Sequence, residues 1–216
     1  MTPDQIQSAA RRKYNAVGDT FYNDSFFYDL IFQAETELVT EGLLIENTYS
    51  TTSVASQREY AYPTSAIAIR RLEYDGNKLA KSTFREDDAM TLSQSDTTDG
   101  GTPTVYQTWD RIIYLRPIPD TADLTIKIFT YDEPVLLSTG NANLAVPTVY
   151  HTAIVDFVVS HLASKNQDFQ TATFYMNRWE QGKVLAKRLH AKVKRTDKFT
   201  RVKNVDDLPA THLGVT

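Results

Sequence analysis

The N-terminal part of the chain has the hydrophobic spacing that is typical of α-helices. Residues 2–5, TPDQ, combine an N-cap threonine, a proline at the first helical position and a glutamine three residues after the cap, which predicts a helix over residues 3–15. A second helical pattern over residues 24–42 is predicted to end in a left-handed C-terminal cap at Gly42. The polar face of this second helix is acidic.

From about Leu44 the pattern changes to a two-residue alternation rich in Thr, Tyr, Val and Ile, which is typical of half-buried strands. Within residues 58–79 the apolar alternation slips by one residue at Arg70-Arg71, and a β-bulge is the simplest explanation. Asp75-Gly76 predicts a two-residue hairpin turn, because both residues accept positive φ angles. Further strands are predicted at 104–109, 112–116 and 124–131, which makes about six short antiparallel strands.

The rest of the chain is predicted to contain one short helix, a polar loop and two long helices. A capping pattern at residues 83–86 predicts a short helix over 84–91, and residues 93–102 read as a mobile loop with a flexible turn at Gly100-Gly101. A helix over 148–164 is apolar on most of its circumference, so we expect it to be packed on two sides. The last helix, 168–195, would be about 40 Å long and is expected to extend beyond the body of the subunit.

The composition is that of a folded protein, with charges sorted along the chain. The 216 residues suffice for one large domain or two small ones, and the absence of cysteine excludes disulfides, thiolate metal sites and a thiol nucleophile. No signal peptide or membrane span is expected. Residues 14–57 contain no Lys or Arg, whereas residues 178–203 contain ten basic residues against two acidic ones. This asymmetry indicates a partner for one end, or pairing of the two ends between copies.

Residue types that carry catalysis or bind metals do not form a recognisable pattern. The histidines lack metal-ligand spacing and are interpreted as structural or surface residues; they are His151, His161, His190 and His212. Residues 86–88 are three adjacent acids, and solvated side chains at a helix start are favoured over a cation site. No phosphate loop or nucleophile elbow occurs. We therefore expect no enzymatic activity, no metal and no cofactor.

The basic C-terminal run has three interpretations, which are docking against an acidic protein surface, a plain solvated helix face, and direct DNA binding. Docking is favoured, because the remainder of the chain is acidic and no DNA-recognition motif appears. The alternative function is that of a DNA-binding accessory protein acting through the basic helix and tail.

The order of these parts resembles the head-to-tail adaptor proteins of tailed bacteriophages. The resemblance rests on a proline corner before AIAIRRLEYDGNKL, a strand ending in the Pro-x-Pro motif of YLRPIPD, and the helix opening VPTVYHTAIVDFVV, over residues 22–189. Ala61-Tyr62-Pro63 departs from the family, which more often has leucine before this proline. The specificity lies in the order and spacing of the motifs.

The resemblance implies a structural virion protein at the neck, made in the cytoplasm of the host bacterium. It implies a ring, usually dodecameric, beneath the portal protein, which contacts a downstream tail or nozzle protein and lets double-stranded DNA pass without sequence-specific contact. It also implies that the C-terminal segment reaches into the portal. The residues expected in this portal-docking arm are Lys192, Lys194, Arg195, Lys198, Phe199, Arg201, Lys203, Leu208 and Leu213.

We therefore expect an α+β fold, with a four-helix body, an inserted antiparallel β-barrel or sandwich-like domain and a flexible C-terminal arm. The predicted boundaries are 1–43 and 148–195 for the helical body, 44–147 for the insertion and 196–216 for the tail. The expected helical core consists of Phe27, Leu30, Ile31, Ile154, Phe157, Val158, Met176 and Trp179.

Two surfaces of this fold are candidates for contacts with other chains. An acidic face made of Glu35, Glu37 and Glu41 is expected either to meet a neighbour's basic helix or to line the channel. Arg70, Arg71, Asp75 and Gly76 are expected on a β domain that faces the tail. At Arg70-Arg71, a bulge with one solvated guanidinium is favoured over an inter-subunit or tail contact.

Overall fold

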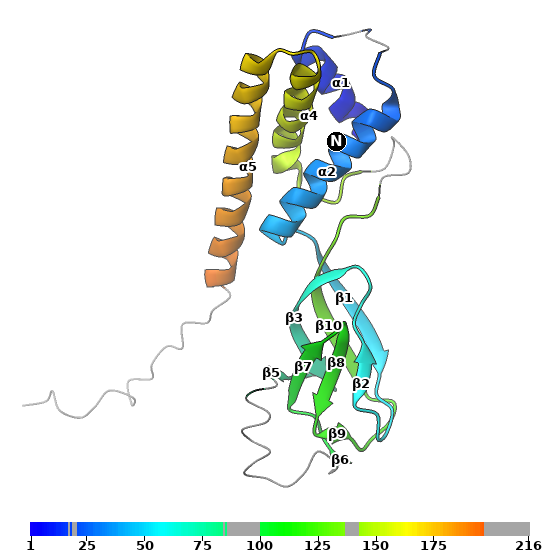
Figure 1. Cartoon of the computed structure of the whole chain (residues 1–216). Helices are drawn as coiled ribbons and strands as arrows, with labels where there is room; N and C mark the ends of the chain where they lie inside the picture. Colours follow the sequence, from blue (N-terminus) through cyan, green and yellow to red (C-terminus); the bar gives the residue numbers. More distant parts are fainter. Residues whose placement is uncertain (17, 19–20, 84, 86–99, 137–142, 197–216) are drawn as a thin grey trace, which may run out of the picture.

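The computed structural model describes residues 1–16, 18, 21–83, 85, 100–136 and 143–196, and side chains up to residue 189. Within these residues the fold is mixed α+β, with four α-helices and mainly antiparallel sheets (Figure 1). The helices are α1 (Pro3–Lys13), α2 (Asp24–Gly42), α4 (His151–Lys165) and α5 (Phe169–Thr196), and a 3-10 turn, η1 (Thr148–Tyr150), precedes α4.

The two N-terminal helices begin and end through local caps. The capping box of α1 is confirmed, because Gln5 N donates to Thr2 Oγ1 at 3.3 Å and Thr2 N donates to Gln5 Oε1 at 3.0 Å. The predicted left-handed cap at Gly42 is wrong by one residue, since the left-handed residue is Leu43, with φ 49°. Gly42 is the last helical residue, where an added Cβ would lie 2.9 Å from the Leu44 side chain, so close packing explains this glycine.

One hydrophobic cluster takes buried side chains from α1, α2, α4 and α5. Trp179 is fully buried there, with its ring centroid 5.0 Å from that of Phe157. Helix α4 contacts the other three helices, which confirms the prediction that it is packed on more than one side. Seven of the expected core residues belong to the cluster and Met176 packs against it.

The β part consists of two four-stranded sheets and one short pair. The first sheet has the order β1 (Glu46–Thr52), β10 (Thr125–Asp132), β3 (Ala66–Tyr74) and β4 (Asn77–Lys78). The second has the order β2 (Glu59–Ala61), β8 (Ile112–Arg116), β7 (Val105–Trp109) and β5 (Ala80–Lys81), and β6 (Gly100–Gly101) pairs with β9 (Ile118–Pro119). Neither sheet closes into a barrel in the described part of the chain.

Several local predictions in the β part are confirmed and two are corrected. The register of β3 against β10 shifts at Arg70, which confirms the bulge, and Asp75-Gly76 forms the hairpin turn with φ of 48° and 77°. Gly100-Gly101 is a strand that pairs in parallel with β9 rather than a flexible turn. The pairing of β5 with β7 is also parallel, so the strands are not all antiparallel as predicted. The predicted helix 84–91 lies, apart from residue 85, outside the described residues, as does most of the predicted loop.

A second hydrophobic cluster joins the two large sheets. It contains Leu72, Tyr74, Ile126 and Ile128 from the first sheet and Tyr60, Tyr106, Ile113 and Leu115 from the second. The chain passes between the sheets at Leu79, which is itself buried in this cluster.

The helices and the sheets occupy opposite ends of an elongated molecule (Figure 1). Two segments link the ends, one between α2 and β1 and the other between β10 and η1. Helix α5 stands at one edge of the helical part, and its C-terminal end projects beyond α4 toward the level of the sheets (Figure 1).

Candidate interaction surfaces

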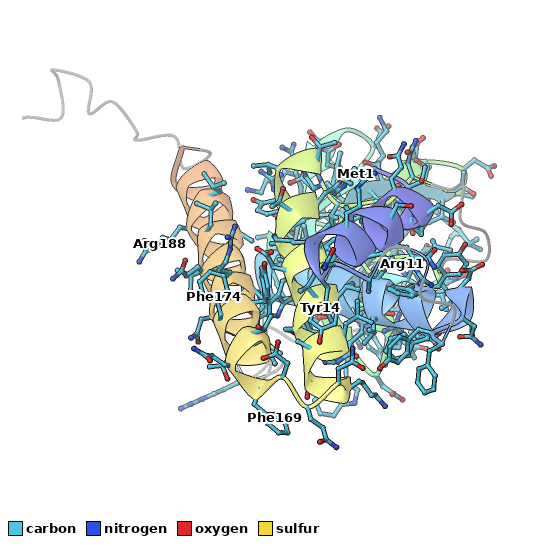
Figure 2. All side chains as sticks on the ribbon, turned by 90° about the horizontal axis from the view of Figure 1, so that it is seen from above. Met1, Arg11, Tyr14, Phe169, Phe174 and Arg188 are labelled. Atoms are coloured by element: carbon cyan, nitrogen blue, oxygen red, sulfur yellow. The ribbon has the colours of Figure 1, made fainter. Side chains whose placement is uncertain are left out.

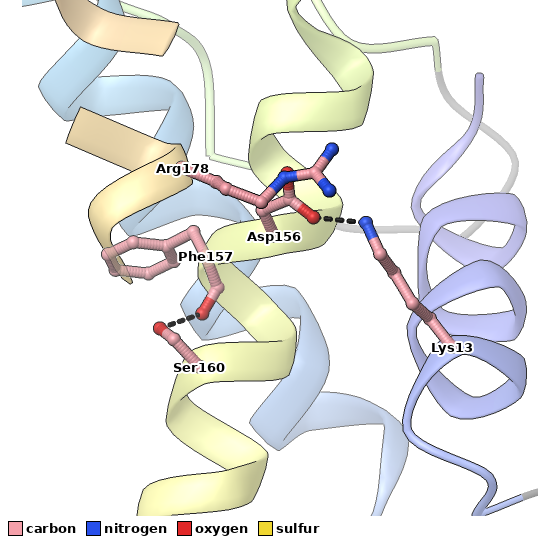
Figure 3. Close-up of polar contacts among 5 residues, drawn as sticks. All are labelled: Lys13, Asp156, Phe157, Ser160 and Arg178. Carbon is pink, nitrogen blue, oxygen red and sulfur yellow. Dashed lines mark hydrogen bonds and ion pairs between the residues drawn. The ribbon is translucent and has the colours of Figure 1, made fainter. Parts of the chain in front are cut away.

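A buried carboxylate links three of the four described helices. Asp156, on α4, has a side chain that is 3% exposed, and its two oxygens pair with Lys13 of α1 and Arg178 of α5 (Figure 3). The Arg178 Nε lies 3.1 Å from Asp156 Oδ2. Burying a carboxylate without partners costs free energy, so Lys13 and Arg178 are needed to compensate the buried charge of Asp156 where α4 meets α1 and α5. This contact fixes α5 against the helical part.

A second set of ion pairs joins α2 to α5. Lys183 Nζ lies 2.8 Å from Glu180, 3.5 Å from Glu37 and 3.8 Å from Glu41, and Lys187 Nζ lies 2.9 Å from Glu41. Burial opposes the charged form of Lys183, but the hydrogen bond and charge of Glu180, together with the other carboxylates, raise its pKa. The acidic face of α2 is therefore matched by basic residues of α5 in the same chain.

Glu35 does not share the surface of Glu37 and Glu41, which corrects the predicted acidic face. Its side chain is buried, and Oε1 accepts hydrogen bonds from Ala145 N at 2.7 Å and Val146 N at 3.1 Å. Burial raises the pKa of Glu35, and the two backbone hydrogen bonds oppose that effect. Glu35 therefore anchors the segment that returns from the sheets to α4.

His151 holds the other side of the same returning segment. Its Nε2 lies 3.1 Å from the Val146 carbonyl oxygen and its Nδ1 lies 2.8 Å from the amino group of Met1. Burial lowers the pKa of this imidazole. The contacts support the interpretation of His151 as a structural residue, and the described residues contain no group of three or more acidic, histidine or cysteine side chains that could hold a metal.

Asp132 organises the point where the first sheet meets the linking segments. Its backbone N donates to Ile45 O at 3.0 Å, and Ile45 packs against the helical cluster. Burial acts against the ionised Asp132 side chain, but side-chain hydrogen bonds lower its pKa overall. The donors to its two carboxylate oxygens are Asn47, Tyr49, Ser65 and Thr130.

A basic concavity lies over the first sheet at the bulge and extends to β5 and β7 of the second sheet. One hollow of about 450 Å³ and an adjoining one of about 350 Å³ share Arg70, Arg71 and Lys78 in their lining. Arg70 pairs with Glu46 at 2.8 Å, and Arg71 pairs with Glu73. Neither arginine side chain is fully solvated, since they are 34% and 45% exposed. The predicted bulge is thus also a cationic surface, and its guanidinium groups are already paired with acids of the same sheet.

The SU10 adaptor protein family model matches residues 1–201, which include every described helix and strand. This chain belongs to the SU10 adaptor protein family. The match confirms the resemblance to phage head-to-tail adaptors, so the chain is a bacteriophage adaptor protein with a structural role in the virion. Curated proteins gave no match to the chain. In the described part of the chain, no helix is long and apolar enough to cross a bilayer.

The portal-docking arm that we predicted for this SU10 adaptor lies at the limit of the described structure. Lys192, Lys194 and Arg195 are on the last turns of α5, where the backbone alone is described. The other predicted arm residues lie outside the described residues: Lys198, Phe199, Arg201, Lys203, Leu208 and Leu213.

Sequence reasoning missed the polar residues that hold the adaptor together. Asp156 could have been found from the sequence, because it is the one acidic residue in a helix that is apolar on most of its circumference and predicted to be packed on two sides. Asp132 had no such signal, because its partners Asn47 and Ser65 are far from it in sequence and meet only through strand register.

Proposed function

We propose that this adaptor forms a ring, dodecameric as the family resemblance implies, beneath the portal, and that the ring connects the DNA-filled capsid to the tail. The observation that carries the proposal is the family match, which spans both the helical end and the β end of the molecule. Helices and sheets at opposite ends of an elongated chain offer separate surfaces to a partner above and a partner below (Figure 1). In a ring, the same geometry surrounds a channel through which the packaged DNA passes.

We also propose how the chain is divided into domains within the ring. Residues 1–43 and 148–195 form the four-helix ring body, residues 44–147 form a sandwich-like domain directed to the next tail component, and residues 196–216 form the tail. The shared cluster between the two large sheets supports the sandwich-like arrangement. The basic concavity at Arg70 and Arg71 gives the β domain a charged surface for that tail contact.

The C-terminal arm is proposed to dock into the portal. Helix α5 is held to the helical part by Asp156 and by the α2 carboxylates. These contacts fix the direction of α5 and therefore the position from which the arm continues. A basic segment that folds onto an acidic partner gains steered association as well as contacts. The arm therefore suits the binding of a preformed acidic surface.

Truncation after Val193 tests this docking. The shortened chain should keep its helical fold, because Trp179, Lys183 and Lys187 are retained. It should nevertheless be lost from the portal in assembled particles, as measured by mass spectrometry of purified heads. Heads that retain the truncated adaptor at the level of the full chain would refute the docking role of the arm.

Direct DNA binding is the competing function, and the internal ion pairs weigh against it. Arg178, Lys183 and Lys187 already contact carboxylates of the same chain, which reduces the number of cations available to phosphates. An accessory DNA-binding protein would bind duplex DNA as an isolated chain with strong salt dependence, and combined Lys192→Glu, Lys194→Glu and Arg195→Glu changes would abolish that binding. We expect no such binding.

A further inference from the structure

Helix α5 carries apolar residues on a face that none of the other described helices covers. Phe174, Leu185 and Leu189 are 56%, 46% and 40% exposed. At about 100° per residue they fall within a sector of about 60°, next to the face on which Trp179 and Ala186 are buried. We call these three residues the α5 stripe. Single exposed apolar residues are common, but a row on one helix face indicates a contact surface.

A second exposed apolar surface lies on the other side of the helical part. Val135 and Leu136 are 81% and 64% exposed, and they follow β10 on the linking segment. Residues 133–136 of this segment rise from the sheets on the side of α2 that is away from α5 (Figure 1). The two surfaces therefore lie on different sides of α2, and both are exposed, so they do not cover one another within one chain.

The charges beside these surfaces are opposite. Arg188 is exposed next to the α5 stripe and lies on the outer side of α5 when the molecule is seen from above (Figure 2). Glu133 is exposed two residues before Val135. Among the described residues, neither Arg188 nor Glu133 forms an ion pair within the chain. Each apolar surface thus has a neighbouring charge that the other surface could satisfy.

We propose that the α5 stripe of one copy packs against residues 133–136 of the next copy, with Arg188 facing Glu133 across the contact. Two different surfaces of one chain make a head-to-tail contact, which closes into a ring when the rotation per copy is suitable. Both surfaces lie beside the helical part and not at the ends of the molecule, so a lateral neighbour fits them better than a portal or tail partner. The inference rests on the proposed ring and identifies its interface.

Cysteine crosslinking tests the interface directly, because the natural chain contains no cysteine. A Leu185→Cys, Val135→Cys double variant is incorporated into particles, whose necks are imaged and then treated with a short bismaleimide. The expected result is a ladder of covalent multimers of the chain on a denaturing gel. The matched control is Val184→Cys with Val135→Cys, because Val184 is 43% exposed but points about 100° away from Leu185 around the helix. This control should give no ladder.

The charged contact is tested in the same particles. In the crosslinkable background, Arg188→Glu should lower the yield of multimers about tenfold by placing like charges together, and a further Glu133→Arg change should restore it. Particles whose necks contain the ring but whose chains give no ladder would overturn the interface and leave the proposed function standing. Covalent dimers from Leu185→Cys alone would also overturn it, since they require a symmetric contact. Absence of the chain from the neck would overturn the proposed function itself.

Discussion

Replacement of Asp156 by asparagine tests whether the buried carboxylate joins α1, α4 and α5. The change keeps the size of the side chain and removes the charge that Lys13 and Arg178 share. Removing one partner of a buried ion pair costs about 3–5 kcal/mol when the remaining charge stays buried. Here the lysine and arginine side chains are 26% and 46% exposed and can regain water. We therefore expect a loss of about 2–3 kcal/mol in the free energy of unfolding, and a fall in Tm of about 4–12 °C for a chain of this size.

Chemical denaturation followed by tryptophan fluorescence measures this loss. Trp179 is fully buried in the helical cluster and reports on it, whereas Trp109 is 66% exposed and is replaced by phenylalanine in all variants to isolate the signal. The matched control is Glu180→Gln, which removes a 55% exposed carboxylate from Lys183 and should cost less than about 1 kcal/mol. If Asp156→Asn costs no more than this control, the carboxylate does not hold the helices together.

Substitutions at three further positions test other parts of the structure. Gly182→Ala should lower the free energy of unfolding in denaturant by about 1–3 kcal/mol, because the new Cβ would lie 2.7 Å from Ala153 Cβ. An increase of about 1 kcal/mol in this free energy, as expected at an exposed helical glycine, would contradict the α4–α5 packing. The lowered pKa of Asp132 gives stability that is present above its unfolded pKa and lost as pH falls through the folded pKa. Asp132→Asn should therefore flatten the pH dependence of Tm below about pH 4. If Tm falls with acid as steeply in this variant as in the natural chain, the assignment to Asp132 is refuted. The raised pKa of Glu35 gives stability that is present below its unfolded pKa and lost as pH rises through the folded pKa. Glu35→Gln keeps an acceptor for Ala145 N and Val146 N, so its Tm at pH 7 should match or exceed that of the natural chain. Glu35→Ala should lower the free energy of unfolding by about 1–3 kcal/mol, and equal stability of the two variants would refute the anchoring role.

Local sequence patterns predicted the elements whose causes are local. The capping box at Thr2, the hairpin at Asp75-Gly76 and the bulge at Arg70 each depend on a few neighbouring residues, and all three occur in the structure. The left-handed residue after α2 was misplaced because glycine is the usual choice there, whereas tight packing against Leu44 requires the glycine one position earlier.

The candidate surfaces were harder to predict because they depend on distant parts of the chain. The sequence shows the charges of Glu37 and Glu41. It does not show that Lys183 and Lys187 of the same chain lie opposite them. Glu35 has the same residue type as Glu37 and Glu41, but it is buried and accepts hydrogen bonds from residues 145 and 146, which return to α2 from a distant part of the chain. The parallel pairing of Gly100-Gly101 with β9 likewise follows from tertiary structure and has no local signal.

Imaging the neck of the assembled particle tests the central claim most directly. Reconstruction of the junction between head and tail should show a closed ring beneath the portal, with each subunit accommodating the helices of this chain at one end and its two sheets at the other. A neck that lacks this chain, or a portal joined directly to the tail with no such ring between them, would contradict the account.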